Sequence, residues 1–554
     1  MRQRIAAEML ESRKECIMKI IVTESIAKEG IDFLREAGFE VDVEFGISGE
    51  DLLKIIDRYD ALIVRSVTKV NAELLDKAVN LKVVGRAGNG VDNIDLKLAT
   101  RKGIIVVNTP ESNTMAAAEL AITLSYAIFR NLVQAVSAGR AHDFRRGRFM
   151  GFELDSKTVG IIGLGRIGSI VAKKLIGAGM IAIAYDPYIS DERFVKLGVK
   201  RAHTLDELLA VSDLITIHTP KTPETIGILG AAELAKCKDG VRIVNAARGG
   251  LVDEKALYDA LVSGKVAAAG LDVLSPEPNY NKKPEEQDYT NPLLTLDNCI
   301  VTPHLGASTR EANFNVGTAV AELVAKALNG EMVPAVNMPP VGAADMEELR
   351  PYLTLAEDLG KIYFQTEKTP VKKIKIKYGG DLAAADVSTE LFTLSFIKGF
   401  LEPIVKDRVN YVNAKVMLES MGIELVESRT TELDKYTNLI TADFVNTSGK
   451  QLSVSGTVFA KSEIRIVEFF GYKLDFEPTD YVLAIQNRDV PGIVGKIGTV
   501  LGLNSINIAA MQWSRKIRGD KAEAFVSVDQ AVDSNIIREL EALDGVLRVS
   551  LICF

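Results

Sequence analysis

Residues 158–186, TVGIIGLGRIGSIVAKKLIGAGMIAIAYD, constrain the fold of this chain more than any other segment. A short apolar run rich in β-branched residues leads into Gly163, Gly165 and Gly168, which are spaced G-x-G-x-x-G. Apolar residues at helical spacing follow, and then a second apolar run that ends at Asp186. This pattern predicts a strand, a tight turn, a helix and a second parallel strand, which together open a doubly wound α/β domain.

The same segment predicts a dinucleotide site. The first two glycines allow a tight turn and let backbone N–H groups approach a pyrophosphate, while the third allows the helix to pack closely on the strand. The helix N-terminus adds N–H donors and the positive end of a dipole. Asp186 is placed to accept hydrogen bonds from the ribose hydroxyls and to repel a 2′-phosphate, so the motif favours NAD over NADP. The alternative is a glycine-rich turn in another kind of α/β protein.

Length and composition limit the remaining possibilities. A chain of 554 residues should hold several domains, because single cores seldom exceed about 250–300 residues. The net charge of −8 argues against a nucleic-acid-binding or anionic-membrane surface. We find no apolar run long enough to cross a membrane. The cysteines have no metal-ligand spacing and favour a reducing, cytoplasmic environment without a metal site; they are Cys16, Cys237, Cys299 and Cys553.

The chain divides into an N-terminal extension and four predicted domains. The extension, residues 1–17, has neither the apolar core of a secretory signal nor the acid-poor character of a transit peptide, and Met18 is an alternative start. Residues 18–113 alternate strand-like and helical runs, as expected for a flavodoxin-like parallel sheet, and an apolar helix over 114–132 leads into the dinucleotide domain. Domain limits are expected at 18–113 plus 301–335, 114–300, 336–476 and 477–554, with a proline-rich boundary near 333–343.

Two predicted strand ends in the first domain carry arginine. Arg65 is followed by Ser66, and Arg86 lies beside Gly88. In open parallel sheets ligands bind beyond the carboxyl ends of the strands. We therefore expect these arginines to hold an anionic substrate, although an ordinary solvated surface charge is the alternative for each.

A catalytic acid–base group must come from a short list, because the chain has only four histidines. His304 ends a predicted strand in TPHLGAST, and two other strand ends carry Arg248 in NAARGG and Glu277 in SPEP. These three side chains should meet at the carboxyl edge of the sheet. A histidine base paired with a carboxylate, beside a guanidinium that polarises a carbonyl, suits hydride transfer between an alcohol and a ketone. His218 also ends a strand and is expected to have a structural role.

The motifs VRSVTKV, GRAGNGVDNID, GLGRIG, HTPKTPET, NAARGGLVDE, LDVLSPEP and PHLGAST resemble the D-isomer-specific 2-hydroxyacid dehydrogenase family. The resemblance covers Met18 to Phe554. It implies that Arg248, Glu277 and His304 are catalytic. It also implies an NAD-binding set of Gly163, Gly165, Arg166, Ile167, Gly168, Asp186, Thr219, Ala247, Arg248, Asp272, His304 and Gly306. The implied substrate-binding set is Arg65, Ser66, Arg86, Gly88 and Arg146, with Arg146 reaching the site of a neighbouring subunit.

This chain departs from the family pattern at two positions. Phe144 stands in the arginine-rich arm over 139–154 where relatives usually have tryptophan. Asn89 replaces a threonine or a small apolar residue, which leaves the local contact to nicotinamide or substrate open.

The last two domains resemble the regulatory part of the long-type members. Residues 345–476 are similar to an intervening domain of the allosteric substrate-binding type, in which we assign no site. Residues 477–554 follow the order β-α-β-β-α-β of a ferredoxin-like fold and resemble an ACT domain. RDVPG and NIAAM match its ligand-facing loops, so Asp489 and Asn507 are candidate contacts for L-serine. The alternative is a module that serves only dimerisation.

Together these features predict an NAD-dependent enzyme that oxidises 3-phospho-D-glycerate to 3-phosphooxypyruvate at the start of L-serine biosynthesis. Arg248 would orient the carboxylate, His304 would take the hydroxyl proton, and Glu277 would tune His304. The resemblance also implies a homodimer or homotetramer. Two alternatives remain open: a dehydrogenase for another D-2-hydroxy acid, and a non-enzymatic NAD-sensing scaffold like the corepressors of this family.

Overall fold

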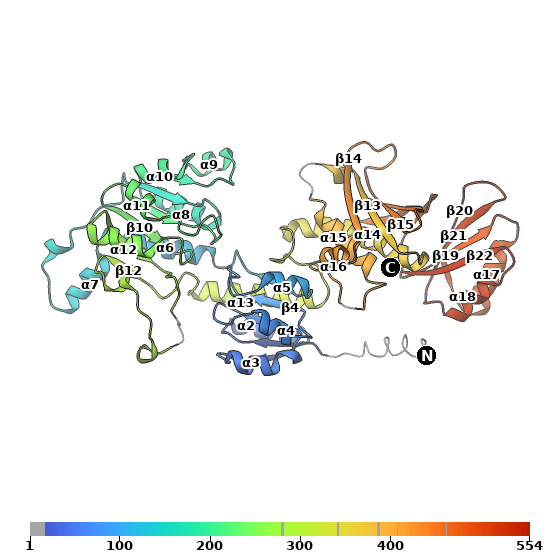
Figure 1. The fold of residues 1–554 in the computed structure, drawn as a ribbon, viewed down its shortest axis with the longest axis horizontal. Coiled ribbons are helices and arrows are strands. Elements are labelled where there is room, and N and C mark those ends of the chain that lie inside the picture. The colour runs from blue at the N-terminus through green and yellow to red at the C-terminus, as the bar shows by residue number, and fades with distance from the viewer. Residues whose placement is uncertain (1–16, 279–281, 341–342, 385–387, 407, 461) are drawn as a thin grey trace.

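Four β-sheets follow one another along the chain in the computed structural model. The structure describes residues 17–278, 282–340, 343–384, 388–406, 408–460 and 462–554. Figure 1 shows an elongated molecule in which the sheets form four domains, numbered here in chain order. The second domain lies at one end, the first lies in the middle, and the third and fourth extend to the other end.

The first sheet is parallel with strand order β2-β1-β3-β4-β5, as predicted for a flavodoxin-like domain. Its strands are β1 (Lys19–Val22), β2 (Glu40–Val43), β3 (Ala61–Val64), β4 (Val83–Arg86) and β5 (Ile105–Asn108). The helices around it are α2 (Lys28–Glu36), α3 (Gly49–Ile55), α4 (Ala72–Lys77), α5 (Leu96–Arg101) and α13 (Arg310–Leu328). α13 returns from far along the chain and packs so closely on α2 that a Cβ at Gly30 would collide with the carbonyl oxygen of Gly317.

The second sheet is also parallel, with order β12-β11-β10-β9-β6-β7-β8. Its strands are β6 (Thr158–Ile162), β7 (Ile181–Tyr185), β8 (Lys200–Arg201), β9 (Leu214–Ile217), β10 (Val241–Asn245), β11 (Val266–Leu271) and β12 (Cys299–Val301). The surrounding helices are α6 (Thr114–Phe129), α8 (Arg166–Gly177), α9 (Asp191–Leu197), α10 (Leu205–Val211), α11 (Ala231–Lys236) and α12 (Glu254–Ser263). Buried alanines along α6 let it pack against this sheet.

The predicted helix over 114–132 ends three residues early, at Phe129. Asn131 then takes a left-handed conformation, and a separate helix, α7 (Leu132–Arg140), follows at an angle of 65° to α6. Among the described residues no single helix is both long and apolar enough to cross a bilayer; only α6 and α7 taken together pass that test.

The third sheet is mixed, with order β14-β13-β15-β16-β17-β18. Only its β13–β14 pair is parallel among the described strands. The strands are β13 (Val371–Gly380), β14 (Glu424–Thr430), β15 (Asn438–Asn446), β16 (Gln451–Phe459), β17 (Glu463–Phe469) and β18 (Tyr472–Phe476). The helices are α14 (Ala343–Thr366), α15 (Glu390–Leu401) and α16 (Ala414–Ser420). Glycines at 360 and 399 let α14 and α15 touch backbone to backbone.

The fourth sheet is antiparallel and has the ferredoxin-like order β20-β21-β19-β22. Its elements are β19 (Tyr481–Arg488), α17 (Ile493–Leu503), β20 (Ile508–Arg515), β21 (Lys521–Val528), α18 (Ser534–Glu541) and β22 (Val546–Cys553). The two helices cover one face around Leu483 and Ile485. The other face places Val482, Phe525 and Ile552 in the hydrophobic core of the third domain. The third and fourth domains therefore share a core.

Candidate functional site

The three glycines of the turn after β6 each meet a different steric demand. Gly163 has a φ of +89°, and a Cβ there would lie 2.8 Å from Cγ2 of Thr219. A Cβ at Gly168 would collide with the carbonyl oxygen of Gly163. Gly165 is the N-cap of α8, and a Cβ there would meet nothing within 4 Å. The turn is therefore closed toward the protein and open at Gly165, as backbone contact with a pyrophosphate requires.

The surroundings of this turn fit a dinucleotide. Asp186 accepts hydrogen bonds from the backbone N–H of Leu164 (2.9 Å) and of Tyr188 (3.0 Å), which fixes its carboxylate beside the turn. The hydroxyl of Thr219 is buried and has no hydrogen-bond partner among the residues that the structure describes. A buried unpaired hydroxyl is costly unless a ligand satisfies it. Arg166, the first residue of α8, forms an exposed ion pair with Glu111 at 3.0 Å.

His304 and Glu277 come together at the carboxyl edge of the second sheet. His304 Nδ1 lies 3.2 Å from Glu277 Oε2. The backbone of His304 is left-handed, with a φ of +54°. Such a conformation costs an L-residue about 1–2 kcal/mol and marks a position that its surroundings determine strongly. Here the backbone N–H of His304 donates to the carbonyl oxygen of Asp272 at 3.0 Å.

Asp272 holds the loop that carries His304. This carboxyl is fully buried, and it accepts hydrogen bonds from the hydroxyl of Thr302 (2.6 Å) and from the backbone N–H groups of Leu305 (2.7 Å) and Gly306 (2.8 Å). Burial raises the pKa of Asp272, and the three hydrogen bonds oppose that rise. The oxygens of Asp272 are thus hydrogen-bonded to other groups of the protein, and the predicted contact of Asp272 with NAD stays a prediction.

Arg248 crosses from the second domain to the first. The loop after β10 is fixed by Asn245, which donates to the carbonyl oxygen of Arg248 at 2.9 Å. The guanidinium donates from Nη1 to the carbonyl oxygen of Ala247 (2.7 Å) and from Nε to Asp92 Oδ2 (3.3 Å). Asp92 lies in the loop between β4 and α5, so the ion pair spans the boundary between the two parallel-sheet domains.

Arg65 and Arg86 face the same region from the first sheet. Arg65 donates to Asn313 Oδ1 at 3.1 Å. Burial, followed by repulsion from Arg248 and Arg65, lowers the pKa of Arg86 to about 10. A Cβ at Gly88 would collide with the guanidinium of Arg86, so the glycine makes room for that side chain. Ser66 is exposed next to Arg65. Guanidinium groups packed closely enough to repel one another provide a site for an anion.

The sequence did not reveal two residues that shape the Arg65 loop. Glu24 accepts backbone N–H bonds from Arg65 and Thr68 at 2.9 Å, and from Val67 at 3.1 Å. The amide of Asn93 donates to the carbonyl oxygens of Arg65 (3.0 Å) and Thr68 (2.7 Å). The only signal for Glu24 was a polar residue at the end of the first strand.

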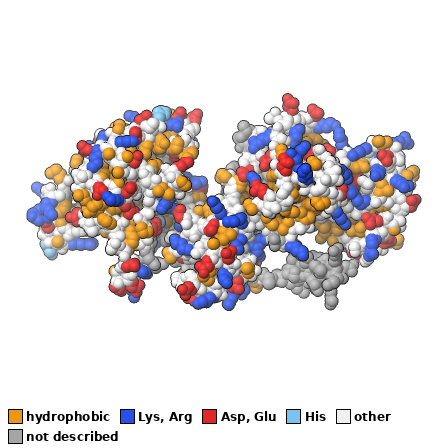
Figure 2. All heavy atoms as spheres, viewed as in Figure 1, with side chains coloured by type: hydrophobic (Ala, Val, Ile, Leu, Met, Phe, Trp, Pro, Cys, Tyr) orange, Lys and Arg blue, Asp and Glu red, His pale blue; other side chains and the backbone are white. Residues whose placement is uncertain are grey.

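Within one chain, Arg146 is not brought near Arg65, Arg86 and Arg248. It begins the short turn η2 (Arg146–Phe149), which packs beside α7. Figure 1 places α7 at the end of the second domain that is remote from the first domain, and Figure 2 shows basic side chains gathered at that end. Phe144 in the same arm is 77% exposed. A substrate contact of Arg146 would need a second subunit and stays a prediction.

His218 does not fit the role of a base that becomes charged. Its ring is buried, and burial lowers its pKa to about 4. Its Nε2 lies 2.9 Å from the hydroxyl of Thr216, the residue before the end of β9. The ring therefore stays neutral near pH 7 and supports the strand end beside the glycine turn.

The two predicted effector residues of the fourth domain have protein partners. Asp489 Oδ2 accepts hydrogen bonds from the backbone N–H of Gly519 (2.8 Å) and from Arg515 (2.7 Å), which lower the pKa of Asp489. The amide of Asn507 donates to Asp529 at 2.6 Å. An effector bound by Asp489 and Asn507 would have to replace these hydrogen bonds with its own.

Comparison with known proteins connects these features. Three family models match the chain: the NAD-binding domain of D-isomer specific 2-hydroxyacid dehydrogenases over residues 122–306, the D-3-phosphoglycerate dehydrogenase intervening domain over 348–470, and the ACT domain over 481–545. A D-3-phosphoglycerate dehydrogenase from Archaeoglobus fulgidus is 43% identical, over 97% of this chain and 100% of its own. One from Methanocaldococcus jannaschii is 42% identical, over 97% and 100%.

The chain belongs to the D-3-phosphoglycerate dehydrogenase family. Its first two domains are also similar to solved structures of other members of the wider dehydrogenase family. The D-lactate dehydrogenase from Aquifex aeolicus, solved with NAD and lactic acid, gives a TM-score of 0.51 at 29% identity, over 56% of this chain and 96% of its own.

Membership of the D-3-phosphoglycerate dehydrogenase family confirms the predicted fold class and cofactor. Two parallel-sheet α/β domains precede a mixed-sheet intervening domain and an ACT domain. The second domain is an NAD-binding domain. From here on, the third and fourth domains are called the intervening and ACT domains.

Proposed function

We propose that this chain oxidises 3-phospho-D-glycerate to 3-phosphooxypyruvate with NAD, the step that opens L-serine biosynthesis. The observation that carries the proposal is that Arg248 extends from the edge that holds the His304–Glu277 pair to the loop of residues 88–92. Arg86 packs against the same loop, and Arg65 follows the neighbouring strand. The Archaeoglobus fulgidus relative, which matches over its full length, is named for this activity.

The substrate has two anionic ends, and the arginines suit both. We assign the carboxylate to Arg248, whose N–H donors also polarise the carbonyl that forms. We assign the phosphate to Arg65 and Arg86 of the first sheet. On this reading residues 18–113 with 301–335 bind substrate, and residues 114–300 bind NAD through Gly165, Asp186 and Thr219.

Proton transfer falls to His304. With Glu277 3.2 Å from Nδ1, that nitrogen carries the proton and Nε2 accepts the hydroxyl proton of the substrate. Glu277 then stabilises the imidazolium. Asp272 keeps the loop of His304 in place through Leu305 and Gly306. Bound NAD supplies the hydride acceptor for the same carbon.

The main alternative is a dehydrogenase for an unphosphorylated D-2-hydroxy acid, since D-lactate dehydrogenases share the first two domains. Steady-state assays with NAD and either 3-phospho-D-glycerate or D-glycerate separate the two. A charged hydrogen bond contributes about 1.5–3 kcal/mol, so we expect kcat/KM to favour phosphoglycerate about 10–100-fold. Equal values would contradict the phosphate assignment. A non-enzymatic NAD sensor would show no turnover of either compound.

We also propose feedback inhibition by L-serine through the ACT domain. Asp489 would accept the ammonium group, and Asn507 offers both a donor and an acceptor. Titration of the whole enzyme with L-serine should lower its rate, D-serine should not, and Asp489→Ala should abolish the response. Undiminished activity at millimolar L-serine would contradict this part. The free cysteines favour the cytoplasm, and the exposed arm around Phe144 favours a homodimer or homotetramer.

A further inference from the structure

The ion pair between Arg248 and Asp92 joins the two dehydrogenase domains beside the proposed substrate site. Nε of Arg248 lies 3.3 Å from Asp92 Oδ2, while Nη1 is held by the carbonyl oxygen of Ala247 at 2.7 Å. Two of the three guanidinium nitrogens thus have fixed partners, one from each domain. Nη2 has no hydrogen-bond partner among the residues that the structure describes, and it is the nitrogen left to bind substrate.

The loop that carries Asp92 leaves space for this guanidinium. A Cβ at Gly90 would collide with Nη2 of Arg248, and it would also lie 2.9 Å from Cζ of Arg248 and 2.9 Å from Asp92 Oδ2. Glycine at position 90 and the carboxylate at 92 together form a cradle in the first domain for an arginine of the second. Any side chain at position 90 would displace the arginine.

The charges around the cradle explain why Arg248 needs a carboxylate partner. Arg248 lies close enough to Arg86 for the two charges to repel each other, and Arg65 adds a third positive charge. Two carboxylates oppose them, Glu24 and Asp92. Glu24 is occupied by the backbone N–H groups of the Arg65 loop. Asp92 is therefore the carboxylate placed to keep Arg248 in the cleft against this repulsion.

We propose that Asp92 is a positioning residue for Arg248: it binds Nε and turns Nη2 toward the carboxylate of the substrate. The proposal rests on the proposed function for the identity of that substrate, but not for the pairing itself. Without Asp92, Arg248 would swing away from Arg86, and substrate would have to draw it back. Asp92 is not in the predicted NAD-binding set, so NAD binding should change little in its absence.

The first experiment compares Asp92→Ala and Asp92→Asn with Asp76→Ala. Asp76 is the matched control, because it pairs with Lys102 on the surface of the same domain and its side chain is 66% exposed, against 61% for Asp92. We expect Asp92→Ala to lower kcat/KM for 3-phospho-D-glycerate about 10–100-fold, with KM for NAD within about twofold. Asp92→Asn should recover part of the loss, because its amide oxygen still accepts from Nε.

A double-mutant cycle tests whether the effect runs through Arg248. Lysine lacks the Nε–H donor, so Asp92→Ala should lower kcat/KM by less than about threefold in an Arg248→Lys background. If the two losses multiplied in full, Asp92 would act elsewhere and the proposal would be overturned. An unchanged kcat/KM in Asp92→Ala alone would overturn it as well.

A second readout needs no substrate. Phenylglyoxal modifies arginine side chains, and the rate at Arg248 can be followed by peptide mass spectrometry. A guanidinium freed from its carboxylate should react several-fold faster in Asp92→Ala and no faster in Asp76→Ala. Equal rates would overturn the proposal. If the unmodified enzyme failed to turn over phosphoglycerate, the proposed function would fail, while this measurement would still decide the role of Asp92.

Discussion

Two domain boundaries in this molecule differ in their contacts: one is polar and the other is apolar. The boundary between the two dehydrogenase domains carries ion pairs in which at least one side chain is exposed, Arg248–Asp92 at 3.3 Å and Arg166–Glu111 at 3.0 Å. The boundary between the intervening and ACT domains is a hydrophobic core. There the ring of Phe525 stacks on Phe476 at 4.9 Å and meets the edge of Phe469 at 4.8 Å.

The difference predicts how each boundary moves. The groups of these ion pairs can be hydrated when the two dehydrogenase domains separate, so these domains can open and close around their ligands. A boundary made of buried aromatic rings does not separate without exposing them. The intervening and ACT domains should therefore move as one body, and the two dehydrogenase domains as two.

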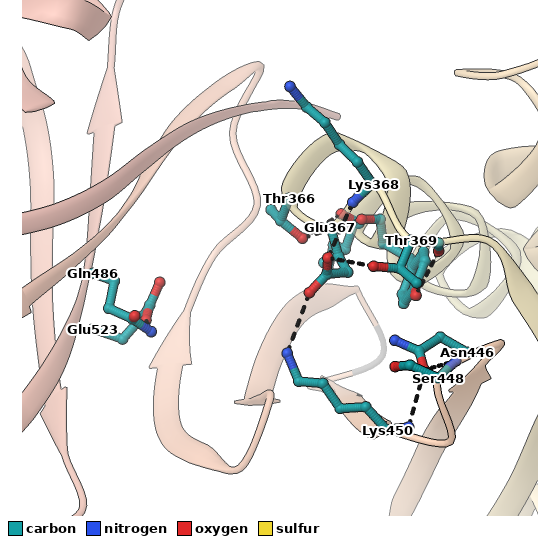
Figure 3. Close-up of polar contacts among 11 residues, drawn as sticks. Thr366, Glu367, Lys368, Thr369, Asn446, Ser448, Lys450, Gln486 and Glu523 are labelled. Atoms are coloured by element: carbon teal, nitrogen blue, oxygen red, sulfur yellow. Dashed lines mark hydrogen bonds and ion pairs between the residues drawn. The ribbon is translucent and has the colours of Figure 1, made fainter.

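The intervening–ACT boundary also has a polar end. Figure 3 shows Glu523 and Gln486 on the ACT sheet, with Glu367 and Lys450 of the intervening domain nearby. Glu523 is 1% exposed and accepts from Gln486 at 3.2 Å, and its Oε1 has no partner among the described residues. Burial raises the pKa of Glu523. These polar groups favour one arrangement of the ACT domain on the intervening domain, because another arrangement would leave more buried groups unpaired.

A third boundary joins the intervening and ACT domains to the dehydrogenase part. Arg408 donates to the carbonyl oxygens of Leu81 (2.7 Å) and Asn80 (3.3 Å), and Asn410 donates to that of Gly103 (2.6 Å). Tyr411, next in the same loop, donates to the half-buried Glu357 of α14 at 3.0 Å. The loop around Arg408 thus contacts the first domain on one side and the core of the intervening domain on the other.

The largest effect should come from His304→Gln, which removes the proposed base. General acid–base catalysis contributes about 10²–10⁴-fold, so kcat should fall by about that factor. NAD binding, measured by fluorescence titration, should persist, since the glycine turn is untouched. Retention of the original kcat would remove His304 from the catalytic set.

Phe525→Ala should break the apolar boundary. Loss of a buried phenylalanine costs about 3–5 kcal/mol. Because the core is shared, calorimetry should show the intervening and ACT domains melting earlier and together, with the dehydrogenase transition unchanged. Leu503→Ala, at an ACT side chain that is 78% exposed, is the control and should change little. A low-temperature transition of the ACT domain alone would contradict the single-body description.

Asp358→Asn should reveal that the stability of the joined intervening and ACT domains depends on pH. Burial raises the pKa of Asp358 to about 7, with Lys361 3.6 Å away opposing the rise. The folded state binds the proton more tightly than the unfolded state, so the stability associated with this group is present below about pH 4 and is lost as pH rises through about 7. The variant should melt higher than the original enzyme at about pH 8 and differ less at about pH 5. The same change at both pH values would refute this titration.

Arg408→Ala should have the smallest effect, and it tests the boundary between the intervening domain and the first domain. It removes two hydrogen bonds to carbonyl oxygens, each contributing about 0.5–1.5 kcal/mol, or up to about 3 for a charged donor. Basal kcat should stay within about twofold, while the L-serine concentration for half inhibition should rise several-fold. An unchanged serine response would show that coupling takes another route.

Much of this architecture could be predicted because its signals are local. The glycine turn, Asp186 and the strand ends at Arg248 and His304 follow from short motifs and from the rule that ligands bind beyond the carboxyl ends of parallel strands. The engagement of Asp272 could not be predicted, because its partners exist only once the loop of Leu305 and Gly306 has folded.

Two helices escaped prediction for different reasons. α15 is buried nearly all round and packs against α14 and α16, so ELFTLSFIKGFL has no amphipathic period to recognise. α7 has no buried residue and follows the left-handed Asn131, so nothing in its sequence distinguished it from an exposed arm. The cradle of Gly90 and Asp92 was hidden because it joins segments more than 150 residues apart, as the Arg248–Asp92 separation of 156 shows.

The central claim, that a guanidinium cluster selects a phosphorylated D-hydroxy acid, is tested most directly by Arg86→Gln. The measurement is the ratio of kcat/KM for 3-phospho-D-glycerate to that for D-glycerate, with NAD saturating. The original enzyme should favour phosphoglycerate about 10–100-fold, and the variant should lose most of that preference while still oxidising D-glycerate. A variant that kept the full preference would contradict the account.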